Sequence, residues 1–425
     1  MNKRKVPKLR FKGFTDDWEQ RKLGEMSSSF EYGLNAAAKE YDGTNKYIRI
    51  TDIDDNSREF SQEDVTSPDA DLSKAEAYKL SEGDILFART GASVGKSYIY
   101  RASDGLVYYA GFLIRAKIRP EYNPEFVFQN TLTSAYEKFI KVTSMRSGQP
   151  GVNAQEYSQF EIRVPSKAEQ DKIATYFRNL DNLITLHQRK LDKLKIIKKS
   201  MLENCFPRNS EKVPKFRFDG FSGDWEQRKF SSVFEGLQNN TLSRAELNYE
   251  SGTVKNVHYG DVLIKFGDYI DASKTELPYI SDDAKTDKFK NSFLQDGDII
   301  IADTAEDDTV GKCTEIQGSK GLKLLSGLHT IACRPKEKYG PMFLGYYINS
   351  PAYHSQLKPL MQGIKVTSIS KSALQDTDMI LPKSIDEQIK IGEYFSNLDN
   401  LITLHQRKLE KLKVIKNSML DNMFV

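Results

Sequence analysis

Two stretches of the chain repeat one long amphipathic pattern, with an offset of 218 between His187 and His405. In the first stretch apolar side chains and one histidine recur every three or four residues, at Leu180, Leu183, Ile184, His187, Leu191, Leu194, Ile197 and Met201. In the second stretch the same positions are Leu398, Leu401, Ile402, His405, Leu409, Leu412, Ile415 and Met419. The first stretch adds a basic opposite face, formed by Arg189, Lys190, Lys193, Lys195, Lys198 and Lys199. This spacing predicts two long helices, each with one apolar stripe.

The expected helix starts are marked by Ser166-x-x-Glu169 and Ser384-x-x-Glu387, which fit a capping box. The NLDN segments at 179–182 and 397–400 are expected to separate a short helix from a long one. A long piece of about 25 residues would span roughly 37 Å, close to one turn of B-DNA. We expect the two long pieces to pair as an antiparallel coiled coil, in which His187 and His405 set the register rather than bind a metal. The alternative is that each helix packs on its own domain or on another protein.

The regions that precede these helices have the pattern of mixed α/β domains. In the first region, short β-type runs bounded by Gly, Asp and Ser lie at 47–53, 83–88, 97–102 and 112–118. In the second region they lie at 256–264, 297–302 and 329–335. A helical segment follows Asn123 in the first region and Pro341 in the second. Each region is long enough to bury its own core.

The whole chain consists of two tandem copies of one plan. KVPKLRFKGFTDDWEQRKL from Lys5 returns as KVPKFRFDGFSGDWEQRKF from Lys212, and GDILFA from Gly83 returns as GDIIIA from Gly297. The ends of the copies are nearly constant and the interiors diverge. Simple duplication with drift would blur all segments alike, so this contrast favours a common frame that carries two different readers.

The composition of the 425 residues narrows the class of protein. Apolar residues are 39% and charged residues 28%, as in a globular protein. We see no apolar run long enough for a membrane helix or a secretory signal, and therefore expect a cytoplasmic location. The three cysteines form no C-x-x-C pair, so we expect reduced thiols rather than disulfides or a zinc site.

Charge is distributed unevenly within the first region. Residues 25–87 hold 6 Lys/Arg and 15 Asp/Glu, a net charge of −9, whereas residues 89–146 hold 9 and 4, a net charge of +5. We expect DNA phosphates to contact the basic part, residues 89–146. Over residues 24–164 the balance is nevertheless 16 against 21, or −5, which predicts weak DNA binding by this chain alone.

Enzyme signatures do not fit the chain. Gly95-Lys96-Ser97 lacks the first glycine of a phosphate-binding loop, because Thr90 stands in its place. Motifs of amino-methyltransferases, nucleases and serine hydrolases are also missing. One open alternative is an Mg²⁺ site in the acidic cluster Asp303, Glu306, Asp307 and Asp308 of the second copy.

The ordered set of motifs resembles the DNA-specificity subunit of type I restriction-modification systems. It consists of GDI-[LI]-[FI]-A-x-T with V-G-K, then S-x-x-E-Q-x-K-I and NLDNLITLHQRKL, and it occurs twice. The resemblance implies an α+β protein with a pseudo-two-fold internal repeat, in which two mixed α/β target-recognition domains are joined by the antiparallel helices. It further implies a non-catalytic subunit that reads a gapped, asymmetric DNA site.

The resemblance also implies partners. Two methyltransferase subunits would dock on the constant helices, whose stripe residues listed above serve as spacer and docking surface, and restriction subunits would join the larger assembly. S-adenosylmethionine, ATP and Mg²⁺ would belong to these partners, and this chain would hold no cofactor or metal. The expected boundaries are constant segments 1–23 and 212–230, recognition domains 24–164 and 231–382, and long helical regions 165–211 and 383–425.

Base or phosphate contacts are expected from polar loops in each domain. In the first domain the candidates are Arg89, Thr90, Lys96, Ser97, Ser144, Arg146, Gln149 and Asn153. In the second domain they are Lys312, Gln362, Lys365, Thr367, Ser368 and Lys371. Asp303 replaces Arg89 there, so the two domains should read different bases. The main rival hypothesis is a two-headed coiled-coil adaptor that holds other proteins and reads no bases.

Overall fold

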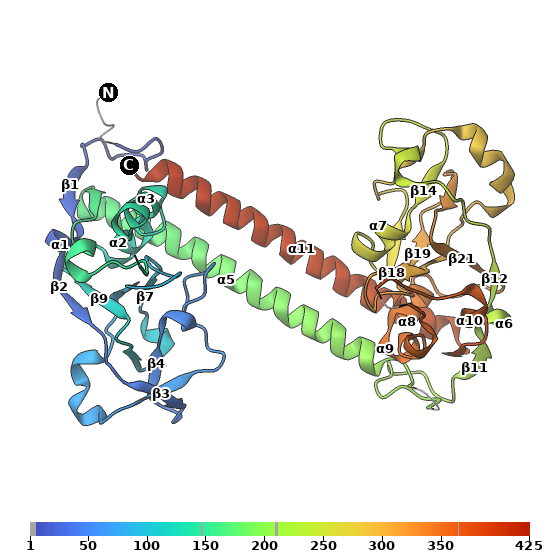
Figure 1. Ribbon diagram of the computed structural model, residues 1–425, viewed down its shortest axis with the longest axis horizontal. Helices are drawn as coiled ribbons and strands as arrows, with labels where there is room; N and C mark the ends of the chain where they lie inside the picture. The colour runs from blue at the N-terminus through green and yellow to red at the C-terminus, as the bar shows by residue number, and fades with distance from the viewer. Residues whose placement is uncertain (1–5, 146–147, 209–210, 364) are drawn as a thin grey trace. The chain divides into compact units, whose positions relative to one another are not determined.

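The computed structural model describes residues 6–145, 148–208, 211–363 and 365–425. The chain divides into two compact units, which we call unit 1 (Met1–Lys190 with His405–Val425) and unit 2 (Leu191–Leu404). Each unit combines small sheets with short helices and includes part of both long helices (Figure 1). The predicted mixed α/β plan, present twice, is confirmed.

Unit 1 is organised around a four-stranded antiparallel sheet in the order β2-β9-β6-β7. Its strands are β1 (Glu19–Lys22), β2 (Ser27–Tyr32), β3 (Ala37–Glu40), β4 (Lys46–Ile48), β5 (Thr66–Asp69), β6 (Ile85–Ala88), β7 (Ser97–Ile99), β8 (Val107–Tyr109), β9 (Leu113–Ile118) and β10 (Glu161–Val164). Its short helices are α1 (Leu23–Met26), α2 (Pro124–Asn130), α3 (Ser134–Thr143) and α4 (Ala154–Tyr157). The strands predicted at 83–88 and 112–118 are confirmed as β6 and β9, and the predicted helix is found as α2 and α3. The run predicted at 97–102 is a strand only in its first half, β7.

Unit 2 has a larger central sheet of five strands in the order β12-β21-β17-β19-β15. The strands of the unit are β11 (Glu226–Lys229), β12 (Phe234–Gly236), β13 (Leu247–Asn248), β14 (Lys255–Val257), β15 (Tyr269–Asp271), β16 (Tyr279–Ile280), β17 (Ile299–Ala302), β18 (Thr304–Ala305), β19 (Cys313–Gln317), β20 (Leu324–Ser326), β21 (Thr330–Pro335), β22 (Thr367–Ser368) and β23 (Asp378–Leu381). The short helices are α6 (Phe230–Val233), α7 (Tyr259–Ile264), α8 (Phe343–Asn349), α9 (Pro351–His354) and α10 (Lys371–Gln375). The strands predicted at 297–302 and 329–335 are confirmed as β17 and β21.

Two other predicted strands are shorter than expected. The run 47–53 ends as a strand at Ile48, because the Asp52 carboxylate accepts a hydrogen bond from the Arg49 backbone N–H at 2.8 Å and turns the chain into a short 3₁₀ helix. The run 256–264 ends at Val257, because the His258 ring accepts from the Gly260 N–H and caps α7. Local side-chain capping interrupts both runs of β-forming residues.

The repeated Gly-Asp before β6 and β17 has a structural role. Gly83 and Gly297 adopt φ of 86° and 91°, a conformation that favours glycine. The buried Asp84 carboxylate accepts a hydrogen bond from the Ser81 N–H at 2.9 Å, and Asp298 accepts from the Gln295 N–H at 2.8 Å. The motif therefore fixes the turn that starts each central strand.

The long helices are α5 (Lys167–Asn204, 38 residues) and α11 (Ile385–Met423, 39 residues). In unit 1 His187 of α5 faces His405 of α11 and Asp181 faces Lys416, so the two helices run antiparallel. In unit 2 the Lys198 ammonium pairs with Asp399 at 2.7 Å. The predicted antiparallel pairing is confirmed within each unit, where α5 and α11 lie side by side (Figure 1).

The predicted break at the NLDN segments is wrong, because both helices run through them without interruption. Asp and Asn are weak helix formers because their side chains compete for nearby backbone groups. Here Asp181 accepts hydrogen bonds from Gln129 at 2.9 Å and Lys416 at 2.6 Å, and Asp399 accepts from Tyr346 at 2.6 Å as well as from Lys198. Tertiary partners satisfy these carboxylates and override the local preference.

The start of each long helix is held by a forked ion pair. The Arg10 guanidinium donates to both Glu169 carboxylate oxygens at 2.7 and 2.8 Å, and Arg217 does the same to Glu387 at 2.7 and 2.8 Å. Both glutamates are buried. The capping-box prediction is therefore wrong for the glutamates, although Ser384 Oγ accepts from the Glu387 N–H at 3.3 Å. A charged arginine is a stronger partner for a buried carboxylate than a backbone N–H.

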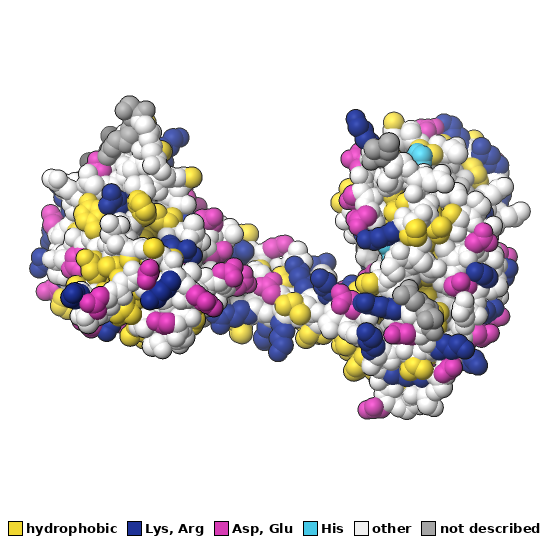
Figure 2. Space-filling model, turned by 60° about the horizontal axis from the view of Figure 1, so that its bottom comes forward, with side chains coloured by type: hydrophobic (Ala, Val, Ile, Leu, Met, Phe, Trp, Pro, Cys, Tyr) yellow, Lys and Arg dark blue, Asp and Glu magenta, His cyan; other side chains and the backbone are white. Residues whose placement is uncertain are grey.

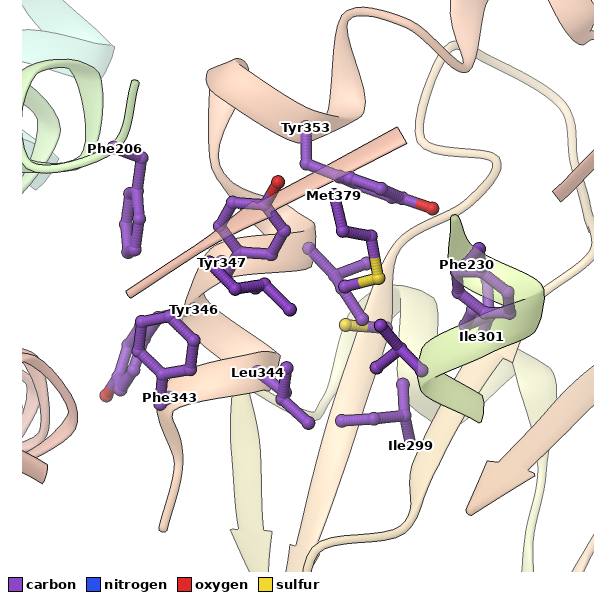
Figure 3. Packing of buried hydrophobic residues seen from close by; sticks show 14 of the residues in the cluster. Phe206, Phe230, Ile299, Ile301, Phe343, Leu344, Tyr346, Tyr347, Tyr353 and Met379 are labelled. Carbon is purple, nitrogen blue, oxygen red and sulfur yellow. The ribbon is translucent and has the colours of Figure 1, made fainter. Parts of the chain in front are cut away.

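The end of each long helix completes the core of the unit that it reaches. Phe206, just after α5, packs in unit 2 against Phe343, Tyr347 and Phe395, with ring centroids 6.2, 5.6 and 6.0 Å away (Figure 3). Phe424, just after α11, packs in unit 1 against Phe126 and Phe177 at 5.6 and 5.5 Å. Each core therefore contains residues from both copies of the repeat.

His187 and His405 meet on the facing sides of the two helices. Their Nδ1 atoms lie 2.8 Å apart, and a hydrogen bond between them requires one donor and one acceptor nitrogen. Burial, followed by the charges of His405, Lys408 and Lys190, lowers the pKa of His187 below its ordinary value. The pair is therefore compatible with at most one proton charge, as expected for residues that set helix register.

We predict that acid weakens this helix contact. A histidine whose pKa is lowered by folding takes up a proton on unfolding, so its contribution is present above pH 6.5 and is lost as the pH falls below that ordinary value. The free energy of unfolding, measured with denaturant from pH 7.5 to 5.5, should fall more steeply for the native chain than for a variant with His187→Leu and His405→Leu. Parallel pH profiles would contradict the prediction, since His258 and His354 titrate in both proteins.

Candidate nucleic-acid interface

In unit 1 the structure brings together the two polar loops predicted to meet DNA. Thr90, two residues after the end of β6, forms an isolated β-bridge with Gly151. The Gly91 N–H donates to the Pro150 carbonyl at 3.1 Å, and the Val152 N–H donates to the Arg89 carbonyl at 2.9 Å. These bonds join segments about 60 residues apart in the sequence and present Gln149, which is exposed, beside Thr90.

Unit 2 repeats this arrangement with different side chains. Strand β18 pairs antiparallel with β22, where Thr304 faces Ser368. The Ile369 N–H donates to the Asp303 carbonyl at 2.9 Å, as Val152 does to Arg89. The backbone N–H groups of Gln362 and Ser368 each donate to the other's carbonyl, at 2.9 and 2.8 Å. Gln362, Thr367 and Ser368 thus lie on one loop pair, and Lys365 and Lys371 are exposed nearby in sequence.

Two predicted contact residues, the lysines of the repeated Gly-Lys, have structural partners within their own unit. Lys96 is 7% exposed; its ammonium donates to the Ile53 carbonyl at 3.0 Å and pairs with Asp55 at 2.5 Å. Lys312 donates to the Leu263 carbonyl at 2.7 Å, and burial lowers its pKa. The lysine of the repeated Gly-Lys therefore has a structural role in both units, because an ammonium group inside a fold needs a hydrogen-bond partner.

Four further candidates are buried, have structural partners or lie outside the described residues. The Ser97 hydroxyl is buried and shares a hydrogen bond with Thr131 at 2.6 Å, and Ser144 is 8% exposed. Asn153 caps α4 by accepting from the Glu156 N–H at 2.9 Å, and Ser370 occupies the same place before α10. Arg146 lies outside the described residues.

A hollow of about 630 Å³ beside this loop pair joins Arg89 with residues that were not predicted from the sequence. It is lined by Tyr32, Arg49, Arg89 and Phe112 among others. The Arg89 guanidinium carbon lies 5.1 Å from the centre of the Tyr32 ring, and Phe112 is 62% exposed. Arginine and aromatic side chains together suit contact with bases and phosphates. Among the residues that were not predicted, only Phe112 had a sign in the sequence, as an aromatic residue directly before the strand 113–118.

The corresponding position in unit 2 has the opposite charge. The Arg89 N–H donates to the Phe112 carbonyl at 3.1 Å, and the Asp303 N–H donates to the His329 carbonyl at 3.1 Å, so the two pairs are equivalent. The His329 Nδ1 lies 3.5 Å from the Asp303 carboxylate, and His329 has φ of 56°. The Asp303 carboxylate accepts hydrogen bonds at the position where the Arg89 guanidinium donates them. The two units therefore present complementary chemistry from one backbone frame.

The acidic loop that could have held Mg²⁺ has other partners. The Asp307 carboxylate accepts from the Thr309 hydroxyl at 2.5 Å, Asp308 pairs with Lys358 at 3.3 Å, and Asp303 faces His329. Across the residues that the structure describes, no group of three or more His, Cys, Asp or Glu side chains is arranged to hold a metal ion. In the same parts of the chain, no helix has the length and apolar content needed to cross a membrane.

The long helices expose three apolar side chains at equivalent positions in each unit. In unit 1, Leu183, Leu186 and Val414 are 43%, 47% and 68% exposed. In unit 2, the equivalent residues Leu401, Leu404 and Ile196 are 43%, 45% and 68% exposed. Figure 2 shows hydrophobic side chains among Lys and Arg along these helices. We call each set an exposed trio.

The other predicted docking residues lie inside the helix contacts. Four of them are buried: Leu180, Leu191, Leu398 and Leu409. Leu194 and Leu412 are partly buried against the cores of unit 2 and unit 1. Of the leucines first expected on the docking surface, only Leu183 and Leu401 are therefore accessible; Leu186, Leu404, Ile196 and Val414 were not foreseen.

Comparison with known proteins agrees with this geometry. Residues 15–196 and 222–414 each match the family profile described as type I restriction modification DNA specificity domain. The type I restriction enzyme MjaVIII specificity subunit of Methanocaldococcus jannaschii is 21% identical over 418 residues, which cover 96% of this chain and 92% of that protein. The putative MjaX specificity subunit of the same organism is 22% identical over 427 residues, with the same coverage of 96% and 92%.

A solved structure shares the fold over nearly the whole chain. The S subunit of a type I restriction-modification system from M. genitalium aligns with a TM-score of 0.58 and 15% identity, covering 99% of each chain. This similarity concerns the fold and does not transfer individual residues.

We predict that the lysines of the repeated Gly-Lys, Lys96 and Lys312, stabilise the folded chain through their hydrogen bonds and do not contact DNA. Lys96→Ala leaves the Ile53 carbonyl without its donor and should lower the free energy of unfolding by about 1 to 3 kcal/mol. Lys312→Ala should act alike in unit 2. Chemical denaturation measures the loss, and any DNA-sequence preference should stay unchanged. A normal stability with an altered preference would restore these lysines to the interface.

Proposed function

Because the chain belongs to the type I restriction modification DNA specificity family, we propose that it reads a two-part DNA sequence, one part with each unit. A specificity subunit is not itself an enzyme, since catalysis belongs to its partner subunits. The observation that carries the proposal is the repeated loop pair, which keeps one backbone frame and changes its side chains from Arg89 to Asp303. Two frames with different donors and acceptors suit an asymmetric site with a gap between its parts.

The constant helices are the proposed docking surface for methyltransferase subunits. The two exposed trios match residue by residue and in exposed fraction. Equivalent surfaces bind equivalent partners, so this chain should hold two copies of one methyltransferase, with restriction subunits added to that core. S-adenosylmethionine, ATP and Mg²⁺ would act in these partners, and the assembly would work in the cytoplasm, where chromosomal DNA lies.

Affinity for DNA is proposed to depend on the partners. Residues 24–164 have 16 Lys/Arg against 21 Asp/Glu, a net charge of −5, and phosphate neutralisation supplies much of the affinity of DNA-binding proteins. The partner subunits would therefore add the missing phosphate contacts. Tight binding by the isolated chain at physiological salt would contradict this part of the proposal.

We predict that the DNA motif methylated by the complex has two parts, one recognised by each unit. This chain, co-produced with its methyltransferase in a host without adenine methylation, should direct modification to one two-part motif with a gap. Exchanging residues 24–164, our proposed first recognition domain, for the corresponding region of a relative should change one part of the motif only. Exchanging residues 231–382 should change the other part.

The outcomes of this experiment separate the proposal from its rival. Single-molecule sequencing of the host genome maps every modified adenine. Random methylation, or a continuous motif that ignores both exchanges, would remove the two-reader proposal and favour an adaptor that holds partners without reading bases.

We predict that each exposed trio binds one methyltransferase copy. Leu186→Glu or Leu404→Glu places a charge on a surface that docking would desolvate, at a cost of several kcal/mol. Native mass spectrometry of the co-produced complex should then show one bound copy for each single variant and none for the double variant. Val142→Glu, on an apolar side chain 66% exposed elsewhere in unit 1, is the matched control and should keep two copies. Two copies retained by the double variant would contradict the proposed surface.

A further inference from the structure

We propose that Arg89 reads a guanine in the half-site of unit 1, and that Tyr32 holds its guanidinium group in place for this contact. The inference deepens the proposed function and rests on it. It assigns both the residue and the base, which the family similarity leaves open.

The backbone of Arg89 is fixed on both sides. Its N–H donates to the Phe112 carbonyl at 3.1 Å, and its carbonyl accepts from the Val152 N–H at 2.9 Å. The residue directly follows β6, the central strand that pairs with both β7 and β9. Arg89 therefore extends from an inner strand of the central sheet, which suits a residue that reads bases in one register.

The side chain of Arg89 is oriented without being neutralised. Its guanidinium carbon lies over the Tyr32 ring, 5.1 Å from the ring centre. A guanidinium group that stacks on an aromatic ring keeps its N–H donors for other partners. Among the described residues, no carboxylate forms an ion pair with Arg89. Arg49 lines the same hollow, but the Asp52 carboxylate takes its Nε and Nη2 at 2.9 and 2.8 Å. Of these two arginines, Arg89 is the one whose donors are available.

The surroundings of Arg89 favour a base edge over a lone phosphate. The lining of the hollow of about 630 Å³ includes Tyr32 and Phe112, which are 44% and 62% exposed. Exposed aromatic side chains suit the flat, partly apolar surface of a base. An arginine edge donates two hydrogen bonds to O6 and N7 of guanine, the commonest specific arginine contact in the major groove.

The second unit supplies an internal contrast. Side chains that support the fold are kept at equivalent positions, as for Lys96 and Lys312. Arg89 is instead replaced by Asp303, whose carboxylate would repel the guanine acceptors. A position that keeps its backbone and reverses its charge between two copies is the expected place for a difference in base preference.

The test uses the complete complex with its methyltransferase and duplexes that carry its methylation motif. Each guanine of the unit 1 half-site is replaced in turn by 7-deazaguanine, which lacks N7. One replacement should weaken binding by the native complex about 5-fold or more, as expected for loss of one of two paired hydrogen bonds. Arg89→Gln should weaken binding to the unmodified motif about 5- to 150-fold and should be insensitive to that replacement.

A change in base preference distinguishes a residue that contacts a base from one that only supports the fold. Arg89→Gln should relax methylation at this one position and leave the rest of the motif unchanged. Tyr32→Ala should relax the same position, whereas Tyr32→Phe, which keeps the ring, should restore the native preference. Arg119→Gln, an exposed arginine beyond the opposite end of β9, is the control and should change no position.

Failure of this inference can be told from failure of the proposed function. A two-part motif whose unit 1 half contains no guanine would overturn the assignment of Arg89 alone. So would a uniform loss of affinity without a change in base preference, which indicates a phosphate contact. The absence of any defined motif would instead overturn the proposed function.

Discussion

The forked ion pair of Arg10 with Glu169, repeated by Arg217 with Glu387, determines where each long helix begins. A carboxylate inside the fold is stable only with a full set of partners, so the segment that carries the arginine has one permitted position. That segment continues into the strand which pairs with the last strand before the helix, β1 with β10 and β11 with β23. The sheet edge, the helix start and hence the direction of the helix depend on this one interaction. This explains why the ends of the repeat are constant while its interior varies.

Much of the frame could be predicted from the sequence, because its signals are local. The helical stripes, the central strands and the antiparallel pairing with His187 opposite His405 follow from spacing and repetition. Two predicted strands ended early because of local side-chain caps. The other errors arose where distant residues decide the outcome. Asp181 stays helical because Lys416 and Gln129 reach its carboxylate, and Glu169 leaves its capping role because Arg10 lies across from it. No window of neighbouring residues contains that information.

The candidate interface was only partly predictable for the same reason. Glycine and polar residues marked the loops around Thr90 and Gln149, and the structure brings those loops together. Lys96 looked like a phosphate ligand in the sequence, yet its stem and charge are turned inward to the Ile53 carbonyl. Tyr32 and Phe112 gave almost no signal, because their shared hollow is assembled from four separate segments. Residue type indicates chemistry, whereas accessibility depends on the complete fold.

The core of each unit includes residues from both copies of the repeat, and this has a consequence for protein synthesis. Unit 2 consists of one continuous stretch, Leu191–Leu404, whereas the core of unit 1 includes Leu420, Met423 and Phe424. A ribosome produces the chain from the amino end, so all of unit 2 is available before the last aromatic side chain of unit 1 exists. The half that is translated first is therefore finished last. A truncated message would yield a chain in which the unit 1 core lacks Leu420, Met423 and Phe424 and keeps apolar surface exposed, which favours aggregation.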